Sequence, residues 1–366
     1  MRVLFAAGGT GGHVYPAIAI ADALRALRPD ADIRFAGTEG RMEAEAVPKA
    51  GYPLDFVPAV PLPRSLSMDL VRFPGRLFGA LRKARALVHG FQPDVAVGTG
   101  GYVSGPVLWA AHRADVPVVV QEQNAYAGLT NRLLGRIATE VHVAFEEAAA
   151  AFAHDKVTVS GNPVREMLLD GDREARRAEG RALFGIPDEA PVLLAFGGSL
   201  GAQRLNEAFV DAFPRLLDAL PDAHIVWATG PRYFDRVNAA VQHPRLHAVA
   251  YLDRMDLAYA AADLVVARAG AITCSELMVT GTPSVLVPSP NVADDHQTHN
   301  ARALERADAA VLLPETALHH LVETLAALLV DDARRVHMSR SARGLARISA
   351  ARVIASRILA LADASR

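Results

Sequence analysis

The sequence predicts an α/β protein made of two Rossmann-like, doubly wound parallel-sheet domains that face a central cleft. Short runs of apolar, often β-branched residues alternate with helical patterns, which is typical of parallel sheets covered by helices on both faces. Each half of the chain begins with such a run, followed by a glycine-rich turn. The 366 residues exceed the roughly 250–300 that one hydrophobic core usually serves, so we expect two domains.

In the first half, we expect a helix over 16–27 with Pro16 in its first turn, where a missing N–H costs little. The strands expected around it are 3–7, 33–36, 94–97, 116–120, 141–144 and 157–159. Gly161-Asn162-Pro163 marks a boundary, because Asn-Pro favours a turn and disfavours helix before the proline.

The second half repeats this pattern. The strands expected there are 192–196, 224–228, 246–250, 264–267, 284–287 and 310–313. The chain ends in an alanine-rich helical segment, 333–364, which we expect to return to the first domain. The predicted domains are therefore residues 1–162, completed by 341–366, and residues 163–340.

Composition and charge narrow the class of protein. A hydrophobic fraction of 51% is ordinary for a globular protein, and a net charge of −2 argues against nucleic-acid binding. The single cysteine, Cys274, excludes an internal disulfide, fits a reducing compartment and is expected to be buried and inert. We find neither a secretory signal nor a run of about 18 apolar residues, and we expect a cytoplasmic protein, soluble or peripheral to a membrane.

Two glycine-rich turns are the most informative motifs. The first is Gly8-Gly9-Thr10-Gly11-Gly12-His13 and the second is Gly197-Gly198-Ser199-Leu200-Gly201-Ala202. Each lies between a strand and a helix, where backbone N–H groups and the helix dipole attract an anion. A tight turn without a ligand is the alternative for either turn alone. The pair favours one phosphorylated ligand between two domains.

Neither turn has the pattern of a dinucleotide site or a P-loop. Val14 and Leu200 stand where a dinucleotide fingerprint needs glycine, and no Gly-Lys-Ser/Thr follows either turn. Gly37 follows the second strand, where a dehydrogenase would carry an acid. The sequence therefore disfavours a nicotinamide-dependent dehydrogenase.

Polar residues follow other strands of the first half. Gln121-Glu122-Gln123-Asn124 ends one strand, Gly98-Thr99-Gly100-Gly101-Tyr102 ends another, and His13 is at the tip of the first glycine turn. Because the carboxyl ends of parallel strands meet at one crevice, we expect an enzyme with its site there. A histidine satisfied by the local backbone is the alternative for His13.

The segment Arg268 to Glu276 follows a strand of the second half. Glu276 is placed to accept hydrogen bonds from the two hydroxyls of a ribose, while the helix N-terminus faces phosphate. Thr273-x-x-Glu276 also matches a capping box, which needs no ligand, so the segment alone does not decide.

The segment 294–300 also follows a strand. His296 and His299 lack a third ligand, so the sequence contains no metal motif and we expect no metal or other cofactor. The amides of Gln297 and Asn300 are better suited to sugar hydroxyls.

Residues 61–90 form a basic amphipathic segment with one acid, Asp69, and a Pro-rich approach at 58–63. The pattern is expected at an anionic membrane surface, although a core-facing helix with a solvated basic back is the commoner case. The cations are Arg64, Arg72, Arg76, Arg82, Lys83 and Arg85. The residues expected to contact the membrane are Arg72, Phe73, Arg76, Leu77, Phe78, Leu81, Arg82 and Lys83.

Together these motifs resemble the MurG family, whose members transfer N-acetylglucosamine from UDP-N-acetylglucosamine to the lipid-linked muramyl-pentapeptide of peptidoglycan synthesis. The resemblance spans essentially the whole chain and implies the GT-B architecture, with the acceptor on the N-terminal lobe and the nucleotide sugar mainly on the C-terminal lobe. The motifs that carry it are Gly8–His13, Arg41-Met42-Glu43, Gly100–Pro106, Glu122-Gln123-Asn124, Ala127–Asn131, Gly161–Arg165, Gly197-Gly198-Ser199, Gly270–Glu276, His296-Gln297 and Asn300.

The resemblance also implies residue roles. It implies that Thr10, Gly11 and Gly12 lie near the diphosphate and that Asn124 and Gln297 contact the sugar. It also implies that Arg165 and Ser199 contact the nucleotide and its phosphates, and that Leu252 contacts the uracil. The diphosphate and ribose fall to Ala271, Ile272, Thr273, Cys274, Ser275 and Glu276, with Glu276 on the diol. The chain departs from the family at Ala269, where serine is frequent, and at Leu200, where glutamine is frequent.

The implied reaction is attack of the muramyl 4-hydroxyl on the anomeric carbon, with inversion and release of UDP. The glycine turns, Arg165 and the helix N-terminus at Ala271 would stabilise the leaving diphosphate. His13 is the first candidate for the base, because histidine titrates near neutrality, and Glu122 is the second. The partners implied are UDP-N-acetylglucosamine, the polyprenyl-linked acceptor and the anionic inner-membrane surface at the cytoplasmic face.

Two alternative functions remain open. A UDP-N-acetylglucosamine 2-epimerase would use the same architecture, but its soluble substrate does not call for the basic apolar segment 61–90. A non-catalytic, membrane-docked subunit would bind the nucleotide sugar without turnover, whereas the polar strand ends favour turnover.

Overall fold

The computed structural model describes residues 1–58, 68–169 and 172–364, with the backbone alone for 68–72. The chain forms two compact units, Met1–Val164 with Arg347–Arg366, and Arg165–Ala346. The sequence predicts these domain boundaries slightly earlier in the chain, between residues 162 and 163 and between residues 340 and 341.

The N-terminal unit is built on a parallel sheet of order β3-β2-β1-β4-β5-β6-β7. Its strands are β1 (Arg2–Ala7), β2 (Asp32–Gly37), β3 (Leu54–Phe56), β4 (Val95–Gly100), β5 (Val118–Glu122), β6 (Glu140–Val143) and β7 (Val157–Val159). The strand order reverses between β1 and β4, which is where open α/β sheets bind ligands. Strand β3 was not expected, because its sequence Leu54-Asp55-Phe56 is not a continuous apolar run.

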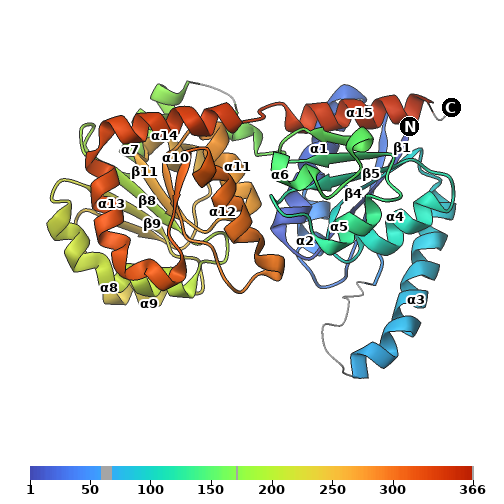
Figure 1. Ribbon diagram of the computed structural model, residues 1–366, viewed down its shortest axis with the longest axis horizontal. Coiled ribbons are helices and arrows are strands. Elements are labelled where there is room, and N and C mark those ends of the chain that lie inside the picture. Colours follow the sequence, from blue (N-terminus) through green and yellow to red (C-terminus); the bar gives the residue numbers. More distant parts are fainter. Residues whose placement is uncertain (59–67, 170–171, 365–366) are drawn as a thin grey trace. The chain divides into compact units, whose positions relative to one another are not determined.

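Helices cover both faces of this sheet (Figure 1). They are α1 (Gly11–Leu27), α2 (Glu43–Lys49), α3 (Met68–Phe91), α4 (Ser104–His112), α5 (Leu129–Leu134), α6 (Glu146–Ala149) and α15 (Ala350–Ala364), with a short 3-10 turn η1 (His154–Lys156). Val3 and Phe5 of β1 share a core cluster with Ile20 of α1 and Ile354 of α15. Leu4 packs on the opposite face with Val107 of α4.

Helix α1 begins at Gly11 and not at Pro16, so the expected start of this helix is wrong. The Thr10 carbonyl accepts hydrogen bonds from the N–H groups of His13 and Val14, at 3.0 and 3.2 Å, and these bonds close the first turn. Pro16 therefore lies inside the helix, and His13 lies in its first turn.

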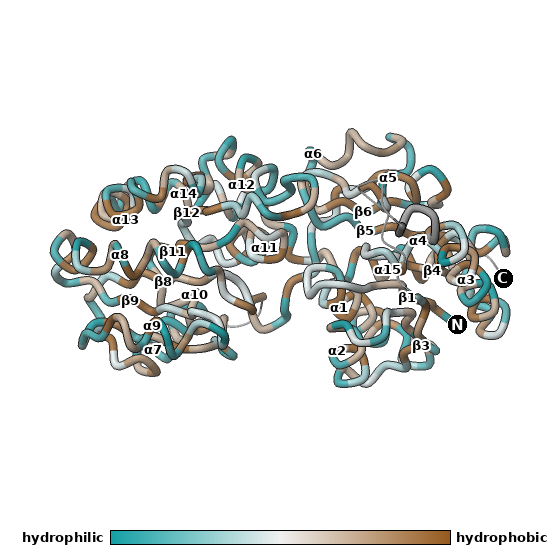
Figure 2. Tube along the Cα trace, turned by 90° about the horizontal axis from the view of Figure 1, so that it is seen from below, coloured by the Kyte–Doolittle hydropathy of each residue, from teal (hydrophilic) through white to brown (hydrophobic). Residues whose placement is uncertain are grey.

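The C-terminal unit holds a second parallel sheet, of order β10-β9-β8-β11-β12-β13. Its strands are β8 (Val192–Phe196), β9 (His224–Ala228), β10 (Leu246–Val249), β11 (Leu264–Ala267), β12 (Ser284–Leu286) and β13 (Ala310–Leu312), at the places predicted from the apolar runs. The strands of both sheets are hydrophobic and the outer faces of the helices are mostly polar, as Figure 2 shows.

The helices of this unit are α7 (Arg173–Phe184), α8 (Gln203–Ala219), α9 (Phe234–Ala240), α10 (Met255–Ala261), α11 (Ala271–Thr280), α12 (His296–Arg306), α13 (Leu321–Val330) and α14 (Asp332–Leu345), with 3-10 turns η2 (Glu166–Leu168), η3 (Ala293–Asp295) and η4 (Glu315–His320). The segment 333–364, which we expected to be helical, is divided into two helices. The chain leaves the helix at Ala346, whose backbone is extended, and α15 then joins the N-terminal unit.

Two doubly wound parallel sheets, each with helices on both faces, are the architecture that the sequence predicted.

Candidate active site

The first glycine turn is held in place by a buried carboxylate. Glu43 accepts hydrogen bonds from the N–H of Gly9 at 3.0 Å and from the N–H of Thr38 at 2.9 Å, and it is fully buried. A Cβ at Gly8 would lie 2.5 Å from the Glu43 carboxylate, so glycine fits there without displacing that carboxylate. The N–H of Gly9 is therefore engaged, whereas the Thr10 side chain makes no capping bond at the start of α1. The helix N-terminus at Gly11 is the part of this turn that suits an anion.

His13 lies between the ends of β4 and β5. Its Nδ1 is 2.9 Å from Oε1 of Gln123, and the Thr99 hydroxyl donates to its backbone carbonyl at 2.8 Å. The ring lies against the backbone of Gly100, where a Cβ would be 2.6 Å from Nδ1. The alternative of a histidine satisfied only by local backbone does not hold, because the partner of the ring is the side chain of Gln123, which directly follows β5.

Glu122 is a buried carboxylate that organises a loop. Its Oε1 accepts hydrogen bonds from the backbone N–H of Asn124 at 2.9 Å and from the Asn124 side chain at 3.2 Å. Its Oε2 accepts from the N–H of Gly128 at 3.1 Å and from Nδ2 of Asn131 at 2.8 Å. Both oxygens are thus occupied by donors of the protein itself, and Asn124 is fixed beside the end of β5.

The second glycine turn is formed by close backbone approach. Gly201 has a φ of +78°, and a Cβ there would lie 2.2 Å from the carbonyl oxygen of Thr229. Ser199 is exposed at the tip of the turn. Ala202 precedes α8 and has no polar side chain with which to cap it. The turn therefore presents a hydroxyl and a helix N-terminus, as a phosphate site requires.

Helix α11 begins directly after the turn at Gly270. Gly270 is the N-cap and has no side chain to satisfy the first N–H groups. Thr273 lies inside the helix, so the alternative of a Thr273–Glu276 capping box is wrong: that motif needs threonine at the N-cap itself. The start of α11 is thus open to an anion, next to Ala271.

Glu276 is the most unusual charged group of this unit. It is 3% exposed, and its Oε2 accepts a hydrogen bond from the Tyr259 hydroxyl at 3.0 Å. Its Oε1 lies 3.3 Å from Nε of Arg165 but receives no hydrogen bond from any described residue. Burial raises the pKa of Glu276, while Arg165 and Tyr259 act in the opposite direction. A buried carboxylate oxygen without a donor is costly unless a ligand satisfies it.

Two amides of α12 have different surroundings. Oε1 of Gln297 accepts a hydrogen bond from the N–H of Ser289 at 2.8 Å, and no described residue is seen to accept from its NH₂ group. Asn300 is fully buried and donates to the carbonyl of Ala269 at 3.1 Å. Gln297 thus keeps its NH₂ donors, whereas the side chain of Asn300 is held inside the unit. The sugar contacts expected for both amides stay predictions.

Other predicted residues of this unit are placed as follows. Leu252 lies in the loop after β10 and is 7% exposed. Cys274 is buried, and burial raises its pKa to about 12, so the thiol is inert. No group of three or more His, Cys, Asp or Glu side chains within 1–58, 68–169 and 172–364 is arranged to hold a metal ion.

Three important residues of the site were not assigned a role from the sequence. Gln123 bonds to His13, Glu43 holds the first glycine turn, and Tyr259 bonds to Glu276. Glu43 and Gln123 lie in the motifs Arg41-Met42-Glu43 and Glu122-Gln123-Asn124. No sequence motif marks Tyr259, because it lies among alanines on α10.

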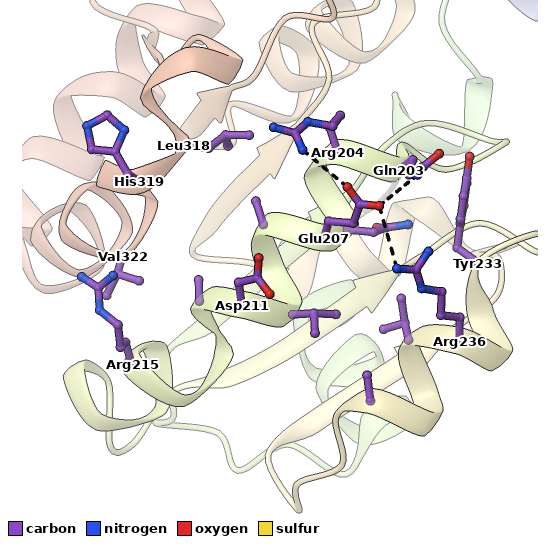
Figure 3. A pocket seen from close by; sticks show the side chains of 16 residues that line it. Gln203, Arg204, Glu207, Asp211, Arg215, Tyr233, Arg236, Leu318, His319 and Val322 are labelled. Carbon is purple, nitrogen blue, oxygen red and sulfur yellow. Dashed lines mark hydrogen bonds and ion pairs between the residues drawn. The ribbon is translucent and has the colours of Figure 1, made fainter.

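A cavity of about 590 Å³ lies elsewhere in the C-terminal unit, between α8, α9 and η4 (Figure 3). At its centre, Glu207 receives a hydrogen bond from Gln203 at 2.9 Å and pairs with Arg204 at 3.6 Å and with Arg236 at 3.9 Å. None of the residues predicted to bind the nucleotide sugar lines it. We therefore place the candidate site at the strand ends and not in this cavity.

Comparisons with known proteins agree with this geometry. Residues 3–143 match the glycosyltransferase family 28 N-terminal domain, and residues 192–358 match the glycosyltransferase family 28 C-terminal domain. A Salinibacter ruber protein named UDP-N-acetylglucosamine--N-acetylmuramyl-(pentapeptide) pyrophosphoryl-undecaprenol N-acetylglucosamine transferase is 54% identical, over 100% of this chain and 98% of its own length.

Solved structures are similar as well. A crystal structure of Acinetobacter baumannii MurG has a TM-score of 0.78 and 28% identity, over 98% of this chain and 99% of that one. A UDP-GlcNAc 2-epimerase from Neisseria meningitidis has a TM-score of 0.68 at 13% identity, over 98% and 100% of the two chains, and shows the fold alone.

The fold and the two domain matches define a GT-B glycosyltransferase. Within that class, the chain belongs to the MurG family.

Proposed function

We propose that this enzyme transfers N-acetylglucosamine from UDP-N-acetylglucosamine to the 4-hydroxyl of polyprenyl-linked N-acetylmuramyl-pentapeptide, the step from lipid I to lipid II in peptidoglycan synthesis. The name of the 54%-identical relative supports both substrates. The structural observation that supports the donor most strongly is Oε1 of Glu276, which is buried without a hydrogen-bond donor. The two hydroxyls of a ribose would supply donors of the right kind.

The donor is proposed to bind mainly to the C-terminal unit. Its diphosphate would meet the uncapped start of α11 and the Ser199 hydroxyl, and Arg165 would add positive charge. Leu252 would contact the uracil, and the free amide donors of Gln297 would contact the sugar. In the N-terminal unit, Thr10, Gly11, Gly12 and Asn124 are proposed to contact the diphosphate and sugar.

In the proposed reaction, the acceptor oxygen forms a bond to the anomeric carbon while the bond from that carbon to the diphosphate oxygen breaks. UDP leaves with the bonding electron pair, and the configuration inverts. The acceptor hydroxyl gives its proton to a base. We propose that Arg165 and the N-terminus of α11 stabilise the departing anion, with no cofactor, so that turnover persists in EDTA.

His13 is proposed as the base and Glu122 as a residue that positions the loop 123–131. All four hydrogen bonds of the Glu122 carboxylate come from the protein, so neither oxygen is available to an acceptor hydroxyl. His13→Ala should lower kcat by about 10²–10⁴-fold, the usual contribution of a general base. Full turnover by His13→Ala, together with loss of turnover in a folded Glu122→Ala variant, would reverse the assignment.

The N-terminal unit is also proposed to contact the cytoplasmic face of the cell membrane as a peripheral protein. The buried face of α3 is formed by Ala80, Ala84 and Val88, while Phe78 is 71% exposed and Arg82 and Lys83 are exposed. Phe73, Leu77 and Leu81, three of the residues expected to contact the membrane, are half-buried. Helix α3 extends away from the sheet (Figure 1). Arg64, positions 59–63 of the Pro-rich approach and the side chain of Arg72 lie outside the described residues.

Neighbouring helices extend this basic apolar surface. Helix α3 packs on α4, which exposes Trp109, and α4 packs on α5, which exposes Leu133. A hollow of about 430 Å³ beside α5 is lined by the cations Arg132, Arg136 and Lys156 and by no carboxylate. No helix of the described residues is both long and apolar enough to cross a bilayer.

Vesicle binding tests the membrane contact. Replacing Arg82 and Lys83 by glutamine should weaken binding to anionic vesicles by about 30-fold, since each cation near such a surface contributes about 1 kcal/mol. The matched control replaces Arg302 and Arg352, two exposed cations on α12 and α15, and should bind as the wild type does. Equal binding by both variants and the wild type would contradict the contact.

The reaction itself is tested by following labelled N-acetylglucosamine from its UDP donor to the lipid-linked acceptor, with UDP release measured in parallel. Labelled lipid product and UDP in equal amounts would support the transferase. UDP-N-acetylmannosamine as product would support the 2-epimerase instead. Donor binding without any product would support a non-catalytic subunit.

A further inference from the structure

Three buried amide side chains form one hydrogen-bonded chain that ends at His13. Nδ2 of Asn162 donates to the backbone carbonyl of Gln123 at 2.9 Å, and Nε2 of Gln121 donates to Oδ1 of Asn162 at 2.9 Å. Nε2 of Gln123 donates to Oε1 of Gln121 and to the backbone carbonyl of Thr99. The other end of the Gln123 amide, Oε1, lies 2.9 Å from Nδ1 of His13. All three amides are at least 97% buried, with exposed fractions of 0% for Gln121, 1% for Gln123 and 3% for Asn162.

Backbone carbonyls fix the direction of this chain. A carbonyl oxygen can only accept, so Asn162 must turn its NH₂ group towards Gln123 O and its oxygen towards Gln121. Gln121 must then donate to Asn162 and turn its own oxygen towards Gln123. Gln123 in turn must donate to that oxygen and to Thr99 O, which leaves its oxygen facing His13. A flip of any one amide would bring two acceptors or two donors together in a buried place, at a cost that the structure avoids.

This direction determines where His13 carries its proton. Because an amide oxygen can only accept, the hydrogen bond to Gln123 requires a hydrogen on Nδ1. A neutral imidazole with hydrogen on Nδ1 has its lone pair on Nε2. We infer that the chain Asn162–Gln121–Gln123 holds neutral His13 in the Nδ1–H tautomer, and that Gln123 is a positioning residue that leaves Nε2 as the proton acceptor of the reaction. The catalytic part of this inference rests on the proposed function.

The surroundings of the ring keep this arrangement in place. The imidazole packs on Gly100, where a Cβ would lie 2.6 Å from Nδ1 and 2.8 Å from Cε1, and the positive φ of +116° suits glycine. A half-turn of the ring would put a carbon in the place of Nδ1 and lose the hydrogen bond to Gln123. One contact thus fixes both the tautomer and the orientation of the ring.

An amide in this position differs from the carboxylate that orients histidine in many enzymes. Its oxygen accepts the Nδ1 hydrogen without placing a full negative charge beside the ring, which would stabilise the protonated imidazole. The neighbouring carboxylate of Glu122 is engaged by Asn124, Gly128 and Asn131 and not by His13. Gln123 therefore orients the imidazole of His13 without adding a negative charge that would favour its protonated form.

NMR of protein labelled with ¹⁵N in the histidine rings tests the tautomer without any assay of activity. At a pH where His13 is neutral, its Nδ1 should show the shift of a protonated ring nitrogen and its Nε2 that of an unprotonated one. The His13→Gln variant assigns these signals. His296, whose Nδ1 lies 2.8 Å from the carbonyl of Ala293, gives an internal reference for the same tautomer. Protonation of His13 at Nε2 in the wild type would overturn the inference.

Variants of Gln123 test its part in setting the tautomer. Gln123→Met is close in size but has no acceptor, so the His13 signals should move towards the Nε2–H form while those of His296 stay unchanged. Gln123→Glu keeps an acceptor for the Nδ1 hydrogen. A proton on its other oxygen would replace the donor that Gln123 offers to the carbonyl of Thr99 and to Oε1 of Gln121, so the neutral acid should return the His13 signals towards the wild-type pattern. If Gln123→Met leaves the His13 signals unchanged in a folded protein, Gln123 does not set the tautomer.

Kinetics separate this inference from the proposed function. Gln123→Met should lower kcat by about 10- to 100-fold, a share of the 10²–10⁴-fold that a general base contributes, while KM for UDP-N-acetylglucosamine stays within about twofold. Full turnover by His13→Ala would refute the proposed base, yet the NMR result on the tautomer would still stand. If the wild type shows the predicted Nδ1–H tautomer but Gln123→Met keeps the wild-type kcat, the positioning role of Gln123 is refuted.

Discussion

Glu122 and Glu276 are both buried carboxylates near strand ends, one in each unit, but their surroundings differ. Glu122 is 1% exposed and accepts four hydrogen bonds from the protein. Glu276 is 3% exposed and accepts one, from Tyr259, while its other oxygen has no donor among the described residues. Buried polar groups are nearly always satisfied. Glu122 therefore stabilises the fold of its own unit, whereas we propose that the unsatisfied oxygen of Glu276 accepts hydrogen bonds from a ligand.

Replacing Glu276 by glutamine should have the largest effect on donor binding. Two charge-assisted hydrogen bonds to a ribose would be lost, which together contribute about 3 kcal/mol, so the Kd for UDP-N-acetylglucosamine should rise about 100-fold. The melting temperature should stay the same or rise, because burial already raises the pKa of Glu276 and disfavours its charged form. Calorimetric titration with the donor and a thermal melt measure the two effects. Unchanged donor affinity would contradict the ligand role of Glu276.

The same substitution at Glu122 should instead destabilise the protein. An amide NH₂ would face donors such as Gly128 N–H and Nδ2 of Asn131, at a cost of about 2 kcal/mol. Urea unfolding should show an earlier transition for Glu122→Gln than for the wild type. Loss of turnover at unchanged stability would point to Glu122 as the base and would remove the contrast with Glu276.

Tyr259→Phe should weaken donor binding less than Glu276→Gln does. The variant removes one hydrogen bond to Oε2 of Glu276, worth about 1 kcal/mol, and should weaken donor binding about fivefold. Tyr52→Phe is a matched control in the N-terminal unit, because Tyr52 donates to Asp22 at 2.6 Å, away from the candidate donor residues. Equal donor affinity of the two variants would show that Tyr259 does not position Glu276.

The smallest effect is expected on the pH dependence of stability. It involves two histidines at the amino ends of strands β9 and β10, away from the candidate site. Nδ1 of His224 lies 2.9 Å from Nε2 of His247, so one of the rings must be neutral. Burial lowers the pKa of both, and positive neighbours lower it further. Because the folded pKa lies below the unfolded value of 6.5, the pair stabilises the protein above pH 6.5, and this stability is lost as the pH falls through the folded pKa.

Urea midpoints at pH 7 and pH 5 test this expectation. The wild type should lose stability between the two values, and His247→Gln should lose less. His112→Gln, which replaces an exposed histidine of α4, should keep the wild-type dependence on pH. A pH dependence that is the same in all three proteins would show that the histidine pair does not contribute. Transfer activity at neutral pH should be unaffected, because the pair lies at the amino ends of β9 and β10.

Much of the fold was predictable from the sequence because apolar periodicity is a local property. All six strands of the C-terminal sheet lie where buried runs such as 192–196 and 264–267 placed them. The errors occurred where local signals were weak or misleading. Strand β3 has a charged residue, Asp55, at its centre, and α1 extends back through Gly11 and Gly12, which have low helix propensity.

The break at Ala346 was missed for a related reason. Its neighbours are good helix formers, so the segment 333–364 reads as one helix, but α14 and α15 belong to different units. Tertiary packing thus overrode local propensity. The motifs of the candidate site were visible as glycine turns and polar strand ends, whereas their hydrogen-bond partners were not.

The sequence by itself determined the two parallel sheets, the glycine-rich turns that follow the first strand of each sheet, and the polar residues at the strand ends. Each of these follows from the chemistry of neighbouring residues. Only the tertiary structure decided which buried carboxylate is satisfied, and which way the amide of Gln123 faces. Those outcomes depend on partners far along the chain, such as Asn162 for Gln121 and Tyr259 for Glu276, because a hydrogen bond is set by where folding brings donors and acceptors together.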